Sequence, residues 1–237
     1  PQLGENVAII GLGLLGLLTI QLASAAGCNV LGIDLDPKRI KLASSLGFEA
    51  VTRQNAESAS VAFTANRGFD SIIICADTSS NDPIELAGVI ARDRAKVVAT
   101  GAVGLTIPRK IYFEKEISLI NSRSYGPGRY DPSYEENGND YPIGYVRWTE
   151  GRNLQSVVDL MAGGKLKVAP LISHRFSIEK AATAYDVITG KKKETFLGVL
   201  LTYSETAETL ESSKVVRFNA QTFNPSNNVK LSVLGAG

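Results

Sequence analysis

The stretch Val7–Gly16, VAIIGLGLLG, decides the fold of this chain. A short apolar run ends at Gly11, Gly13 and Gly16, and a helical apolar pattern then continues over Leu14–Ala26. A strand, a tight turn and a helix start form the setting in which G-x-G-x-x-G indicates a dinucleotide site. Gly11 would make the turn, Gly13 would admit a pyrophosphate, and Gly16 would let the helix pack close to the strand. The phosphates would lie on the helix N-terminus.

Asp34 supports this interpretation, because glycines alone also serve ordinary turns. It ends a second apolar run, Asn29–Ile33, close to the offset at which the fingerprint expects an acid for the ribose hydroxyls. A carboxylate there favours NAD, since the 2′-phosphate of NADP would face a like charge. Arg39 is the counter-argument, because a nearby arginine can accommodate that phosphate, although it also fits a solvated side chain at a helix start. The sequence predicts NAD, with NADP as the alternative.

The composition is that of a globular protein and narrows the function classes. Of 237 residues, 44% are apolar and 21% are charged, and the net charge of +1 gives no electrostatic case for nucleic acid or a membrane surface. We find no apolar stretch of the roughly 18 residues that a spanning helix needs. Cys28 and Cys75 lie in apolar runs and are interpreted as buried thiols, which fits a reducing cytoplasm. Two cysteines and one histidine, His174, are too few for a zinc site within the chain.

Apolar strands alternate with helical patterns along the chain, which predicts an α/β fold with a parallel sheet covered on both faces. Right-handed crossovers would give a Rossmann sheet of order 3-2-1-4-5-6, doubly wound. The expected strands cover residues 7–10, 29–34, 49–51, 71–76, 95–100, 117–121 and 196–203. The expected helices cover residues 14–26, 37–46, 55–66, 83–92 and 154–161, with another beginning near residue 178.

The ligand of such a sheet lies at the carboxyl ends of the strands, where this chain has small or hydrogen-bonding residues. An alternative is that strand ends simply favour such residues as turn formers. The predicted cofactor-binding residues are Gly11, Gly13, Leu14, Leu15, Gly16, Asp34, Arg39, Ala76, Asp77, Gly101, Ala102, Ser124 and Tyr125. We name no catalytic residue and no metal ligand, because the single histidine, His174, fits a structural role before a helix.

Several motifs in this order resemble the cofactor-binding half of the zinc-type, medium-chain alcohol dehydrogenases: VAIIGLGLLG, LGIDLDPKR, SIIICADT, KVVATGAVG and PLISHRFSIEKAATAYDVI. The resemblance runs from about Val7 to Tyr203. It implies hydride transfer between an alcohol or carbonyl substrate, a sugar-derived alcohol among the candidates, and NAD(P). In that family a GroES-like catalytic domain precedes the cofactor domain and carries the zinc ligands. We therefore expect that domain to be missing, zinc to bind only through residues outside this chain, and the fragment alone to be inactive. Members are commonly homo-oligomers.

The sequence suggests four segments. We assign a dinucleotide-binding domain to residues 1–125, an aromatic loop and a C-terminal α/β part to 126–203, and a polar linker to 204–228. Residues 229–237, VKLSVLGAG, predict the start of a second nucleotide-binding fold, and a final strand with a glycine tail is the alternative. This combination resembles two-domain bacterial oxidoreductases whose second half is similar to glucose–fructose oxidoreductase.

A long segment, residues 124–152, is crowded with aromatic side chains and reads as a loop, which in a compact domain is usually functional or mobile. Our hypothesis is that its start borders the nicotinamide and that its aromatics wall the substrate pocket or dock a partner domain. A surface loop stabilised by its own rings is the alternative. Two function classes therefore remain: a dehydrogenase represented by its cofactor half, or a non-catalytic NAD-binding sensor or interaction module.

Overall fold

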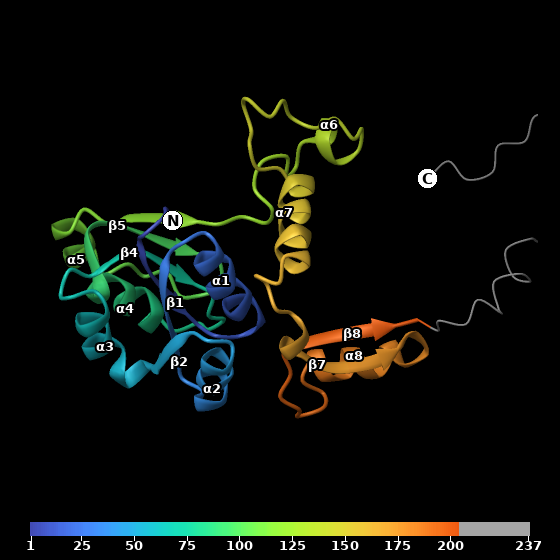
Figure 1. The fold of residues 1–237 in the computed structure, drawn as a ribbon, viewed down its shortest axis with the longest axis horizontal. Coiled ribbons are helices and arrows are strands. Elements are labelled where there is room, and N and C mark those ends of the chain that lie inside the picture. Colours follow the sequence, from blue (N-terminus) through green and yellow to red (C-terminus); the bar gives the residue numbers. More distant parts are fainter. Residues whose placement is uncertain (204–237) are drawn as a thin grey trace, which may run out of the picture.

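A computed structural model describes residues 1–203 as a six-stranded parallel sheet followed by a two-stranded parallel sheet (Figure 1). The large sheet has the order β3-β2-β1-β4-β5-β6, which confirms the predicted Rossmann topology. The strands are β1 (Asn6–Ile10), β2 (Asn29–Asp34), β3 (Glu49–Thr52), β4 (Phe69–Ile74), β5 (Ala91–Ala99), β6 (Ser118–Asn121), β7 (Ile172–Ser177) and β8 (Gly198–Thr202). The helices are α1 (Leu14–Ala25), α2 (Pro37–Ser45), α3 (Ala56–Phe63), α4 (Asp82–Ile90), α5 (Arg109–Glu114), α6 (Pro132–Glu135), α7 (Glu150–Ala162) and α8 (Ala181–Ile188). The expectations for residues 204–237 lie outside the described part of the chain.

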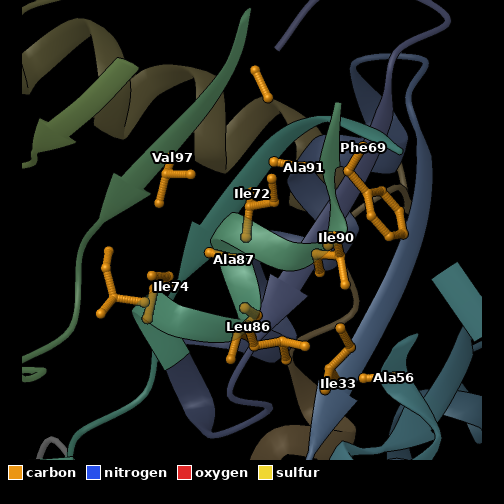
Figure 2. Close-up of a cluster of buried hydrophobic side chains, with 14 of the residues drawn as sticks. Ile33, Ala56, Phe69, Ile72, Ile74, Leu86, Ala87, Ile90, Ala91 and Val97 are labelled. Atoms are coloured by element: carbon orange, nitrogen blue, oxygen red, sulfur yellow. The ribbon is translucent and has the colours of Figure 1, made fainter. Parts of the chain in front are cut away.

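Two apolar cores, one on each face of the large sheet, hold the helices against it. Neighbouring side chains of β1 point to opposite faces, so that Val7 and Ile9 pack with α1 and α2 while Ala8 and Ile10 belong to the core under α3, α4 and α5. Figure 2 shows this second core, in which Phe69 and the isoleucines of β4 meet α4. Burying such a side chain contributes about 1.5–3 kcal/mol. The apolar strand runs therefore fix which helices cover which face.

The structure differs from the expected element bounds around α4. The helix was expected to reach Arg92, but it ends at Ile90, and β5 begins at Ala91 instead of Ala95. Ala91 has extended backbone (ψ 145°), and the Arg92 side chain pairs with Asp70 on β4 at 2.6 Å. The two residues of this cross-strand ion pair are 22 positions apart in the sequence, so local helical periodicity does not predict it.

Three elements, α5, α6 and β7, were not expected, and α7 begins at Glu150 instead of Leu154. The six residues of α5 are too few for a periodic signal, and tertiary contacts hold them: Tyr112 Oη donates to the carbonyl of Ile84 at 2.8 Å. Burial raises the pKa of this Tyr112 hydroxyl. Lys115 Nζ donates to three carbonyls at the end of α4 and the start of β5. Long-range hydrogen bonds therefore hold this helix in place, and no local sequence pattern predicts them.

The β7–β8 unit with α8 lies beside the large sheet and is attached to α1 (Figure 1). Leu171 is buried in the core formed by α1 and α2. Gln21 of α1 is buried as well; its Nε2 donates to the carbonyl of Lys167 at 3.3 Å, and its Oε1 accepts the Lys167 N–H at 2.7 Å. This two-way hydrogen bond joins segments 146 residues apart and places the second unit against the first.

We expect Gln21→Leu to lower the free energy of unfolding by about 2 kcal/mol, because two Lys167 backbone groups lose their partners. Urea denaturation measures the loss, and hydrogen exchange should show a faster Lys167 amide. Gln155→Leu is the matched control, since Gln155 is exposed and bonds only its helix neighbour Asp159. A similar loss of stability in both variants would contradict the tether.

Candidate functional site

The turn after β1 has the geometry that the glycine pattern predicts. Gly11 has a φ of +93°, the left-handed region, and a Cβ there would lie 2.7 Å from the backbone nitrogen of Ala76. At Gly16, a Cβ would lie 1.8 Å from the carbonyl oxygen of Gly11. Both positions therefore exclude a side chain, the first for the turn and the second for the approach of α1.

Gly13 has the opposite surroundings. It is the N-cap residue of α1, and a Cβ there would meet no atom within 4 Å. No side chain caps the helix and no acid lies in its first turn. The first backbone N–H groups of a helix have no intrahelical partners, and together with the helix dipole they favour an anion. The open space in front of Gly13 thus fits a diphosphate.

Asp34, at the end of β2, faces the same turn. Asp34 is only 7% exposed. Its Oδ2 accepts the Leu12 N–H at 2.6 Å, and its Oδ1 accepts the Asp36 N–H at 2.8 Å. Arg39 Nη1 lies 3.6 Å from Oδ2. A carboxylate has about four lone-pair sites, so two remain for ribose hydroxyls after these backbone bonds. Asp34 therefore anchors the glycine turn, a role that sequence reasoning did not find.

A cleft of about 940 Å³ opens at the carboxyl ends of β1, β2 and β4. This is at the upper end of the usual range for ligand pockets. The predicted residues that line it are Gly11, Gly13, Leu14, Asp34, Arg39, Ala76 and Asp77. The predicted residues that lie outside its lining are Leu15, Gly16, Gly101, Ala102, Ser124 and Tyr125. The structure thus brings seven of the thirteen together, and their binding role stays a prediction.

The residues after β5 contact the segment after β4 that lines the cleft. A Cβ at Gly101 would lie 2.0 Å from the carbonyl oxygen of Ala76, so this glycine lets the ends of β4 and β5 approach. The carbonyl of Ala102 accepts the Thr78 N–H at 2.8 Å. Both residues therefore position the wall that Ala76 and Thr78 contribute.

The aromatic segment bonds chiefly to itself. Tyr125 Oη donates to Glu135, which also pairs with Arg129 at 2.8 Å, and the rings of Tyr134 and Tyr141 stack at 5.7 Å between centroids. The segment, expected to be without regular structure, includes the short helix α6. Ser124 lies at its start with a φ of +47°. These contacts within the segment hold its residues together. Its suggested role beside the nicotinamide stays a prediction.

Sequence reasoning missed much of the cleft wall. Arg53, after β3, bonds Asp82 at the start of α4 with Nε–Oδ2 2.9 Å and Nη2–Oδ1 2.7 Å. The two residues are 29 positions apart, so no spacing rule predicts this pair, and only the folded structure shows it. The further lining residues that were missed are Ile10, Ile33, Leu35, Cys75, Ser80, Pro83, Glu194, Thr195, Phe196 and Leu197.

The β7–β8 unit supplies the segment 194–197 to the cleft. Glu194 Oε2 lies 3.4 Å from His174 Nε2, and His174 Nδ1 lies 2.8 Å from Ser173 Oγ. Leu197 packs against the core that contains Leu171. The tether of this unit to α1 therefore completes the wall.

The two cysteines are free thiols. Burial raises the pKa of the Cys75 thiol, which lines the cleft beside Ala76, and of the Cys28 thiol. Within residues 1–203, no three His, Cys, Asp or Glu side chains are grouped so that they could hold a metal ion. In the same part of the chain, we find no helix that combines the length and apolar character needed to cross a membrane.

Residues 15–136 match the model of a protein family described as zinc-binding dehydrogenase. The chain belongs to this family. Among curated relatives of the chain, YdjL of Escherichia coli strain K12, an uncharacterized zinc-type alcohol dehydrogenase-like protein, is 26% identical over 205 residues, which cover 84% of this chain and 50% of that protein. D-xylulose reductase A of Aspergillus oryzae is 26% identical over 206 residues, covering 82% of this chain and 50% of that protein. The chain spans about half the length of the curated relatives it matches.

Solved structures share the fold. Alcohol dehydrogenase TADH from Thermus sp. ATN1 superposes with a TM-score of 0.64 at 23% identity, over 86% of this chain and 52% of that one. Galactitol-1-phosphate dehydrogenase from Escherichia coli gives a TM-score of 0.63 at 26% identity, over 84% of this chain and 54% of that one. The chain therefore carries the Rossmann fold of an oxidoreductase family, as its motifs predicted.

Proposed function

We propose that this chain is the NAD-binding portion of an alcohol dehydrogenase that transfers hydride between an alcohol and NAD. The observation that carries the proposal is the joint placement of the open N-terminus of α1 and the Asp34 carboxylate in one cleft. When bound, the nicotinamide would accept or donate the hydride. The backbone amides at Gly13 and Leu14 would hold the diphosphate, and the free lone pairs of Asp34 would accept from the adenosine ribose.

The surroundings of Arg39 support NAD over NADP. Its guanidinium lies 3.6 Å from Asp34 and 4.0 Å from Asp36, so two carboxylates already balance its single charge. A 2′-phosphate would have to compete with both. It would also approach Asp34, whose buried side chain has little water to screen the repulsion.

We propose further that the catalytic residues and the zinc come from outside this chain. Zinc would act as the Lewis acid that polarises the substrate oxygen. The relatives' names, D-xylulose reductase and galactitol-1-phosphate dehydrogenase among them, support a sugar-derived alcohol as substrate. The proposal also includes a second oxidoreductase domain after residue 228, a homo-oligomeric assembly and a cytoplasmic location. A non-catalytic module would instead bind NAD without turnover in every longer form of the protein.

We expect the chain to bind NADH at least about tenfold more tightly than NADPH, a difference of about 1.4 kcal/mol from like-charge repulsion at Asp34. Fluorescence titration with each reduced cofactor measures it. In Arg39→Ala, which removes the cation at 3.6 Å from the Asp34 carboxylate, the preference for NADH should persist or grow. Tighter binding of NADPH by the unmodified chain, lost in Arg39→Ala, would overturn the assignment of NAD.

A further inference from the structure

The guanidinium of Arg53, a planar cation, lies in the cleft wall, where it bonds Asp82 at the start of α4. Arg53 follows β3, the edge strand next to β2, and lines the cleft together with Leu35, Thr78 and Pro83. If Asp34 receives the adenosine ribose, the adenine lies next to that ribose in the same cleft, whose wall includes Arg53. The base and Arg53 would then share one space.

The hydrogen bonds of Arg53 leave its flat faces free. Nε and Nη2 bond the Asp82 carboxylate at 2.7–3.0 Å, and Nη1 lies 3.7 Å from Glu57. Bonds of this kind lie in the plane of the guanidinium, so its edges are taken while its faces can stack on an aromatic ring. The side chain is 26% exposed, and the two-point bond to Asp82 holds it in one orientation.

The charges around Arg53 argue against a phosphate as its ligand. Asp82 and Glu57 supply two negative charges against one positive charge, so a phosphate would meet a net negative surrounding. A purine is neutral, flat and polarisable, and it can stack on a guanidinium whose charge is already paired. Apolar neighbours such as Leu35 and Pro83 suit a purine as well.

We propose that Arg53, held by Asp82, is the platform on which the adenine of the dinucleotide stacks. This inference rests on the proposed function, because it assumes that the cleft holds a dinucleotide. It adds a binding residue whose role depends on a planar side chain, so that lysine, with the same charge, cannot replace it.

Arg53→Lys in the full chain tests the proposal, with ADP-ribose and reduced nicotinamide mononucleotide as the two half-ligands. We expect ADP-ribose and NADH to bind roughly 3- to 30-fold more weakly, the range that stacking on a guanidinium covers. The mononucleotide should change less than about twofold. Calorimetric titration gives the constants, and the melting temperature reports whether the variant is folded.

Glu57→Gln is the matched control: it removes the weaker partner of Arg53 but does not line the cleft, and it should leave both ligands unchanged. Unchanged ADP-ribose binding by folded Arg53→Lys, or an equal loss for both half-ligands, would overturn the adenine platform. If Arg53→Lys weakened the binding of NADPH alone, the platform would be overturned too, because Arg53 would then be a phosphate ligand. If the unmodified chain bound neither NADH nor ADP-ribose, the proposed function itself would fail, and the platform with it.

Discussion

Gly16→Ala is expected to destabilise the chain by about 3 kcal/mol, whereas Gly13→Ala leaves its stability within about 1 kcal/mol and abolishes tight NADH binding. A methyl group at Gly16 would lie 1.8 Å from the carbonyl oxygen of Gly11, a backbone atom fixed by the turn. Alanine gains about 1 kcal/mol over glycine in a helix interior, but this gain is smaller than the cost of separating α1 from the turn.

The methyl group at Gly13 meets no protein atom within 4 Å, and the φ of −67° suits alanine. It occupies the space in front of the first amides of α1, so we expect NADH affinity to fall by at least about 30-fold. Urea denaturation and fluorescence titration of both variants measure the two effects separately. Equal loss of stability in the two variants, or normal NADH binding by Gly13→Ala, would contradict the assignment of these glycines.

Asp34→Ser is expected to lower both the stability and the affinity for NADH, each by about 1–3 kcal/mol. The serine hydroxyl is too short to accept from both Leu12 and Asp36, whose N–H groups the carboxylate now bonds at 2.6 and 2.8 Å. Arg39 would also lose the nearest carboxylate, which lies at 3.6 Å. The ribose would lose a charged acceptor. Denaturation and calorimetric titration with NADH give the two quantities.

Asp36→Ser is the matched control for this prediction. Asp36 caps α2 by accepting the Lys38 N–H at 2.8 Å, and serine is a comparable N-cap residue. Both stability and NADH affinity should therefore stay close to those of the unmodified chain. Full NADH affinity in Asp34→Ser would show that the carboxylate only anchors the turn.

The order of the sheet could be predicted because its signal is local and repeated. The β1 run VAII and the β4 run SIII place apolar side chains on both faces, which only a covered parallel sheet satisfies. The bounds of α4 and β5 could not be predicted, because β5 begins where Ala91 pairs with Phe69 of β4, a contact between residues far apart in the sequence. Helix α5 was missed for a related reason, since the bonds of Tyr112 and Lys115 across to α4 hold it.

The candidate site divides in the same way. The sequence by itself determined the glycine turn, the open helix N-terminus and the acid at the end of β2, because each depends on residues a few positions apart whose backbone geometry only certain side chains permit. Only the tertiary structure decided that Arg53 meets Asp82 and that Glu194–Leu197 closes the cleft. Packing of Leu171 and the Gln21–Lys167 bonds bring distant segments there, and such contacts depend on where whole elements come to rest against one another.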